Sequence, residues 1–157
     1  MSERRWRQES PIGTLTVHAS ELGVHRIEFG DHPIDGAEAR DAAVAGELDE
    51  YFTGGRREFT VAVDLSDYAP HPGVDVLQTL RREVGWGETV TYGELAEMAG
   101  RPRAARFVGN VMARNPIPIL IPCHRVVAAG GRLGGYGATG TDTKRWLLER
   151  EGVIDLR

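Results

Sequence analysis

Alternating and helical patterns of apolar residues divide the chain at a proline- and glycine-rich stretch, residues 67–73. Before that stretch, polar and apolar residues alternate at 13–20 and 24–30, which predicts a two-stranded hairpin. An apolar stripe of helical period follows within 37–55, and alternation returns at 58–65. The first part of the chain is therefore predicted to be an antiparallel sheet with one helix.

After the stretch, apolar residues recur with the period of a helix. The predicted helices lie at 74–84, 91–100, 102–114 and 141–152. The second starts with a capping box of Thr91 and Glu94. About two residues around Gly100 separate it from the third, which holds Pro102 in its first turn. Two helices joined this closely favour a helix-turn-helix unit.

A chain of 157 residues can build one large core or two smaller lobes. The patterns favour an α+β protein with an N-terminal α/β lobe at 1–69 and a mainly helical C-terminal domain at 70–157. The single cysteine cannot form an internal disulfide. No apolar run approaches membrane-spanning length, and the first ten residues lack the apolar core of a signal peptide. We therefore expect a cytoplasmic protein without membrane contact.

The charge distribution is uneven, although the net charge is only −4. Residues 1–97 hold 19 acids and 9 bases, whereas 98–141 hold no acid and several arginines: Arg101, Arg103, Arg106, Arg114, Arg125 and Arg132. An acid-free arginine segment in an acidic protein is typical of a surface that binds a polyanion. The alternative is a solvated basic face, which would ordinarily contain some acids.

The only cysteine lies in the run Ile121–Val127, IPCHRVV. A lone cysteine is often an inert core thiol. Here, however, Pro122 fixes the approach to Cys123, and His124 and Arg125 bring potential cations that favour the reactive thiolate. Adjacent side chains of an extended segment face opposite ways. A relay from Cys123 to His124 therefore needs a bend or a bridging water, with a carboxylate to orient the imidazole.

Small residues interrupt the arginines of the predicted helix at 102–114: Ala104, Ala105, Gly109 and Ala113. They allow either close approach to another molecule or tight packing between helices. The sequence lacks a second cysteine and a compact cluster of histidines and carboxylates, so no metal site is expected. Residues 135–140, GYGATG, imitate a dinucleotide fingerprint but lack the second strand that it needs, so no cofactor is expected.

These motifs together resemble the O6-alkylguanine-DNA alkyltransferases, or methylated-DNA–protein-cysteine methyltransferases. IPCHRVV, with NPIPIL before it and GGRLGGY after it, carries the resemblance most specifically. The similarity extends from GETVTYGELAEMAGRPRAARFVG to KRWLLEREG, residues 87–152. In the first lobe it is looser, through SPIGTLTV, GVHRIEF and LDEYFTGG. The resemblance implies a ribonuclease-H-like first lobe and a helix-turn-helix in the second.

The resemblance also implies the reaction. The thiol would take an alkyl group, mainly methyl, irreversibly from O6 of guanine in duplex DNA, with O4 of thymine as a further candidate. The base would be flipped into a pocket, and each monomer would act once, without a cofactor. By this resemblance Cys123 is the acceptor, His124 its base through a water, and Glu151 the residue that orients His124. Tyr92 would protonate the leaving guanine, and Asn115 would brace the segment.

Further positions carry over from the family pattern. The backbone carbonyls of Cys123 and Val126 would read the guanine amine, Tyr136, Met112 and Pro118 would line the pocket, and the N–H of Gly137 would contact O6. Arg106 resembles the finger that replaces the flipped base. The other expected DNA contacts are Arg101, Arg103, Ala104, Ala105, Phe107, Arg114 and Arg125.

Some positions depart from the family pattern. Phe107 stands where a small residue is usual, and Pro72, Gly73 and Leu77 replace larger residues at the junction of the lobes. Three alternatives stay open: a relative that binds lesions without repairing them, a relative that uses a small-molecule alkyl donor, and a Cys123–His124–Glu151 hydrolase. The departures support only the second. The retained Cys123 argues against the first.

Overall fold

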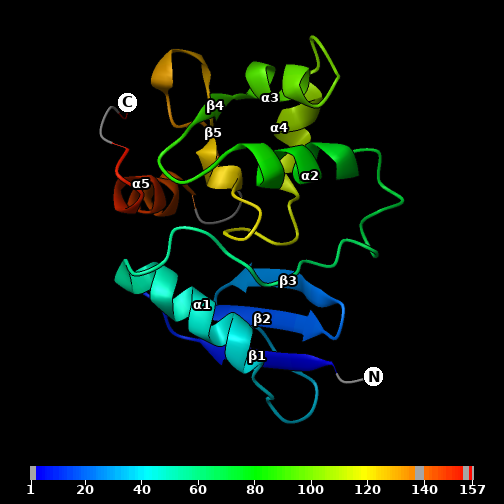
Figure 1. The fold of residues 1–157 in the computed structure, drawn as a ribbon, viewed down its shortest axis with the longest axis vertical. Coiled ribbons are helices and arrows are strands. Elements are labelled where there is room, and N and C mark those ends of the chain that lie inside the picture. Colours follow the sequence, from blue (N-terminus) through cyan, green and yellow to red (C-terminus); the bar gives the residue numbers. More distant parts are fainter. Residues whose placement is uncertain (1–2, 137–139, 154–155, 157) are drawn as a thin grey trace. The chain divides into compact units, whose positions relative to one another are not determined.

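The computed structural model describes residues 3–136, 140–153 and 156. In these residues the chain is α+β, with a small antiparallel sheet and five α-helices (Figure 1). The chain divides into two compact units, Met1–Tyr68 and Ala69–Arg157, and the boundary in the sequence falls within the proline- and glycine-rich stretch. No helix in the described part of the chain is long and apolar enough to cross a membrane.

The sheet of the first unit has the order β1-β2-β3, with antiparallel neighbours. Its strands are β1 (Arg4–Gln8), β2 (Leu15–Ser20) and β3 (Gly23–Phe29). The predicted hairpin is confirmed as β2 and β3. The sequence pattern missed β1, in which Trp6 is the only apolar residue among arginines and Gln8. Gln8 is nevertheless buried, because its side chain accepts a hydrogen bond from Trp6 Nε1 and donates to Asp49 and the Ala45 carbonyl.

One helix of the first unit, α1 (Ala42–Thr53), follows the sheet in sequence and confirms the predicted apolar stripe. The Asp41 carboxylate accepts the N–H groups of Ala43 and Val44, and this cap starts the helix. Gly54 ends it in the left-handed conformation, with φ of 90°.

The prediction of a strand at 58–65 was wrong. This segment makes one isolated parallel bridge, between Val24 and Val63, supported by hydrogen bonds of 2.9 and 2.7 Å to β3. The buried carboxylate of Glu47 explains the difference, since it accepts the backbone N–H groups of Thr60 and Val61 at 2.8 and 3.2 Å. Those two donors are satisfied by a side chain of α1 instead of a neighbouring strand.

The second unit is mainly helical. It contains α2 (Val74–Glu83), α3 (Tyr92–Met98), α4 (Ala105–Ala113), α5 (Gly140–Arg150) and a two-stranded parallel sheet of β4 (Val90–Thr91) and β5 (Val126–Val127). Two short 3₁₀ turns, η1 (Cys123–Arg125) and η2 (Ala129–Gly131), flank β5. The helices share a core of fully buried apolar side chains, among them Leu77, Leu80, Leu95, Val108 and Leu147.

The connection between α3 and α4 differs from the prediction in one respect. The capping box of Thr91 and Glu94 is present at the start of α3. However, α4 begins at Ala105, three residues after Pro102. Gly100 and Arg103 both have left-handed φ values, 75° and 65°, so the chain turns twice before it can become helical.

Candidate active site around Cys123

The segment that leads to Cys123 is held by the side chain of Asn115. Its Nδ2 donates to the Ile121 carbonyl at 2.9 Å, and its Oδ1 accepts the Ile117 N–H at 3.0 Å. Within this loop the buried Ile119 has a φ of 76°, which is rare for a β-branched residue. Asn115 therefore fixes a backbone path that the chain would not adopt on local preference alone.

Cys123, His124 and Arg125 form the 3₁₀ turn η1 and not the start of an extended segment. The Arg125 N–H donates to the Pro122 carbonyl at 2.9 Å and closes the turn. A relay between the adjacent side chains of Cys123 and His124 requires a bend or a bridging water. The bend is present, and only after it does the chain enter β5.

A buried carboxylate organises the side chains of this turn. Glu151, 2% exposed and directly after α5, accepts hydrogen bonds from His124 Nε2 at 2.8 Å and from Arg125 Nε and Nη2 at 2.8 and 3.1 Å. Arg125 also donates Nη1 to the Val84 carbonyl at 2.8 Å. The other ring nitrogen of His124, Nδ1, is buried and has no hydrogen-bond partner among the described residues.

The charges of this network follow from its burial. Burial alone would raise the pKa of Glu151, but the charge and hydrogen bonds of His124 and Arg125 outweigh it and lower that pKa to about 2. Burial lowers the pKa of His124 below its usual value, against the opposing effect of Glu151. At neutral pH the pair is therefore a carboxylate and a neutral imidazole, which can accept a proton.

Cys123 itself is buried, and burial raises the pKa of its thiol. Hydrogen bonds from Asn115 and Tyr136 and the charge of Lys144 act in the opposite direction. The expected cationic neighbours were His124 and Arg125. His124 is neutral at rest, and Arg125 is paired with Glu151. The resting group is thus a thiol, and a base must remove its proton before it can act as a nucleophile.

A cavity of about 330 Å³ opens beside Cys123. It is lined by Tyr92, Gly109, Met112, Ala113, Cys123, Gly135 and Tyr136. The structure thus brings together Cys123 and three other predicted site residues, Tyr92, Met112 and Tyr136. Pro118 and Val126 are buried but do not line the cavity, and Gly137 lies outside the described residues.

Tyr92 enters the cavity from the start of α3. Burial, followed by the charge of Cys123, raises the pKa of its hydroxyl, so the group stays protonated and can donate. Gly134 packs against this hydroxyl so closely that a Cβ at that position would lie 2.8 Å from Tyr92 Oη. The position of the hydroxyl therefore depends on a glycine at 134, which the sequence argument did not single out.

The predicted DNA-contacting residues fall into two groups. Arg103, Arg106 and Arg114 are exposed, and Ala104, Ala105 and Phe107 are partly exposed. Arg101 instead binds Asp75 at 3.2 Å and the Pro72 carbonyl at 2.7 Å, with its guanidinium 4.8 Å from the centre of the Phe107 ring. Arg125 is only 7% exposed.

The placement of Arg125 corrects its assignment as a DNA contact. A phosphate cannot reach a guanidinium that is buried and bound to Glu151 and the Val84 carbonyl. Sequence reasoning also missed Lys144, whose side chain is fully buried. One signal could have found it, because Lys144 is the only lysine in a chain that otherwise uses arginine. Among the described residues, no group of three or more histidine, cysteine or acidic side chains could hold a metal ion.

Two family models match the sequence. The 6-O-methylguanine DNA methyltransferase, DNA binding domain, matches residues 74–153, and the ribonuclease-like domain of the same family matches residues 8–65. The first match contains Cys123, His124, Glu151 and the cavity. The chain belongs to the 6-O-methylguanine DNA methyltransferase family.

Named relatives support the assignment of the chain to this family. The methylated-DNA–protein-cysteine methyltransferase of Methanosarcina acetivorans is 39% identical, over 92% of this chain and 95% of the relative. That of Mycobacterium bovis is 40% identical, over 91% of this chain and 88% of the relative. A crystal structure of Mycobacterium tuberculosis OGT in complex with DNA superposes with a TM-score of 0.76 at 36% identity, over 92% and 90% of the two chains.

Proposed function

We infer that this chain repairs DNA directly, by moving an alkyl group, mainly methyl, from O6 of guanine to Cys123. The observation that carries the inference is that the only thiol of a methyltransferase-family chain lines a cavity and shares a turn with His124, whose ring is bound to Glu151. The cavity volume of about 330 Å³ lies within the usual range of small-molecule sites, about 300–1,000 Å³. The thiol is consumed, so each molecule acts once and needs no cofactor.

The proton of the thiol leaves through His124. We propose that a water bridges the thiol and His124 Nδ1, the buried ring nitrogen that has no partner among the described residues. His124 accepts the proton, and Glu151, bound to Nε2 at 2.8 Å, orients the ring and stabilises the imidazolium. Because the thiol pKa is raised, the thiolate forms mainly when this relay operates.

The thiolate sulfur then attacks the alkyl carbon. A new S–C bond forms as the C–O6 bond breaks, and the electron pair stays on the guanine. Tyr92, protonated at rest, donates its proton to the departing base. The Val126 carbonyl, expected from the resemblance to accept the guanine amine, instead accepts a hydrogen bond from Lys144 Nζ at 2.6 Å and lies outside the cavity lining. Met112 and Tyr136 line the cavity and pack against the flipped purine.

The DNA partner follows from the position of the lesion. Cys123 is buried at the wall of a cavity, so a guanine that is paired and stacked in the duplex must be flipped out before the sulfur can reach its O6 alkyl group. We propose that α3 and α4 act as a helix-turn-helix, with the exposed Arg106 of α4 filling the vacated space. Ala104 and Ala105 allow close approach of α4, and the exposed Arg103 and Arg114 contact phosphates.

The first unit would be the ribonuclease-H-like lobe, and a single chain holds every proposed catalytic group, so a monomer suffices. We propose a cytoplasmic location, because a nucleophilic thiol must be kept reduced.

A turnover count tests the function. A duplex with one O6-methylguanine, in tenfold excess over protein, should lose one methyl group per protein molecule and then stop. Cys123→Ser should remove none. Removal of many methyl groups per molecule would indicate a hydrolase, and removal of none by the natural chain would refute the inference.

A further inference from the structure

Lys144 is a buried cation that the relay above does not use. It is the only lysine among 19 lysine and arginine residues, and its side chain has no exposed surface. It lies on α5, one turn before the buried Leu147 and Leu148. Taking an ammonium out of water costs several kcal/mol, so its retention at a buried position needs a reason.

The contacts of Lys144 join three parts of the site. Nζ donates to the Val126 carbonyl at 2.6 Å and to the Gly135 carbonyl at 3.2 Å, and it lies 5.9 Å from the centre of the Tyr92 ring. Val126 directly follows the turn of the nucleophile, whereas Gly135 and Tyr92 line the cavity. The ammonium thus connects the turn with the wall of the cavity.

These contacts leave the charge of Lys144 without an anion at rest. The two partners are neutral carbonyls, and none of the described carboxylates lies within ion-pair distance of Nζ. Burial accordingly lowers the pKa of Lys144 to about 8, and the charge of Cys123 is what opposes that change. The missing anion is supplied when the thiol ionises.

The other groups around the sulfur do not supply an unmatched positive charge, as Lys144 does. Tyr92 and Tyr136 are neutral donors, and Asn115 carries no charge. His124 becomes positive on accepting the proton, but its charge is matched by Glu151, and Arg125 is bound to the same carboxylate.

We propose that Lys144 is a positioning residue whose ammonium is the counter-charge of the Cys123 thiolate and whose hydrogen bonds hold the cavity wall against the nucleophile turn. This proposal deepens the function inferred above, since it names the group that makes the thiolate attainable in a dry pocket. An arginine would present a larger, planar fork, whereas the compact ammonium fits between two carbonyls. This difference in shape explains why position 144 holds a lysine while the other basic positions of the chain hold arginine.

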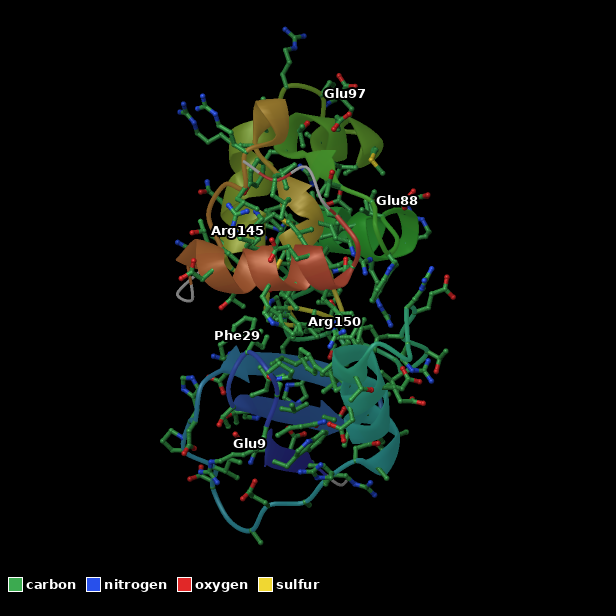
Figure 2. The ribbon with its side chains drawn as sticks, turned by 90° about the vertical axis from the view of Figure 1, so that its left-hand side faces the viewer. Glu9, Phe29, Glu88, Glu97, Arg145 and Arg150 are labelled. Atoms are coloured by element: carbon green, nitrogen blue, oxygen red, sulfur yellow. The ribbon has the colours of Figure 1, made fainter. Side chains whose placement is uncertain are left out.

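The rate of Cys123 alkylation by iodoacetamide as a function of pH tests the counter-charge. Lys144→Met keeps the length of the side chain and removes the charge. We expect its rate at pH 7 to fall by about tenfold or more, with the midpoint moved to higher pH by about one unit or more. Lys144→Arg should recover part of the rate, because it restores the charge. The matched control is Arg145→Met, which removes a charge from the next residue of α5 (Figure 2) and should leave the profile unchanged.

A second measurement needs no change at Lys144, in case the methionine variant does not fold. Because the chain has one lysine, protein labelled with ¹³Cε-lysine gives one lysine side-chain signal. In the natural chain the thiol and the ammonium titrate as a coupled pair, and a thiolate that forms as the pH rises holds the proton on Lys144. In Cys123→Ala no thiolate can form, so the signal should titrate at lower pH than in the natural chain. Identical titrations, or a Lys144→Met profile that superposes on that of the natural chain, would overturn the proposal.

These outcomes are separable from failure of the proposed function. Iodoacetamide and the lysine signal report on the sulfur without DNA, so they decide the role of Lys144 even if no methyl group is transferred. If transfer occurs, Lys144→Met should slow it by the same factor as alkylation, while binding of an unmodified duplex in a gel shift is unchanged.

Discussion

Replacing Glu151 with glutamine keeps the shape of a buried side chain and removes its charge. The carboxylate accepts three hydrogen bonds, from His124 Nε2 and from Arg125 Nε and Nη2. Glu151 and Arg125 are 2% and 7% exposed, so the variant leaves a guanidinium buried without its counter-charge. Breaking such a pair costs about 3–5 kcal/mol. We therefore expect Glu151→Gln to lower the free energy of unfolding of the second unit by about that amount at pH 7.

The pH dependence gives a second estimate of the same quantity. The pKa of Glu151 is about 2 in the folded chain against an ordinary 4.5, a difference worth about 3 kcal/mol. Because the folded pKa is the lower one, this stabilisation is complete above pH 4.5 and is lost as the pH falls toward 2. The difference between the natural chain and Glu151→Gln should therefore be constant from pH 7 to about pH 5, and then shrink toward zero.

Guanidinium-induced unfolding at a series of pH values measures this difference, and peptide hydrogen exchange assigns it to the second unit. Glu149→Gln is the matched control, since Glu149 is an exposed carboxylate on the same helix. Its effect should stay within about 0.5 kcal/mol. A loss below about 1 kcal/mol for Glu151→Gln, or a loss that does not change between pH 6 and pH 2, would refute the reasoning.

Three further variants test the site. Gly134→Ala places a methyl group 2.8 Å from Tyr92 Oη at a position with a left-handed backbone. The variant should transfer benzyl groups more slowly than the natural chain, with a smaller loss of rate for methyl groups; rate constants equal to those of the natural chain for both groups would contradict this. Arg106→Ala should slow duplex repair by about tenfold or more while changing the reaction with free O6-benzylguanine little, and equal losses would remove its assignment. Asn115→Ala loses two backbone contacts and should lower the melting temperature, consistent with about 1–3 kcal/mol; an unchanged temperature would argue against the brace.

The sequence predicted those elements whose signals are local. The stripe and glycine of α1, the hairpin of β2 and β3, and the capping box of α3 each lie within one short window. It missed β1, whose only apolar residue is Trp6, and it predicted a strand at 58–65 because it could not see Glu47 binding that backbone.

For the site too, the sequence predicted those residues whose signal is local. The motif around Cys123 predicted that a thiol and a histidine belong to one site, and both lie in the turn η1. Arg125, however, was wrongly predicted to contact DNA. Its burial depends on its pairing with Glu151, which lies 26 residues further along the chain and gives no local signal around Arg125. Lys144 was overlooked because its partners are backbone carbonyls at 126 and 135, and a side-chain pattern carries no signal for such contacts.

The central claim is that the Cys123 sulfur itself becomes the alkyl acceptor. Incubation with a duplex containing O6-methylguanine, followed by intact mass measurement and peptide mapping, tests it most directly. The account predicts one added methyl group per chain, located on the peptide that contains Cys123, with unmodified guanine left in the DNA. A demethylated duplex alongside a protein of unchanged mass, or a methyl group on any other residue, would contradict it.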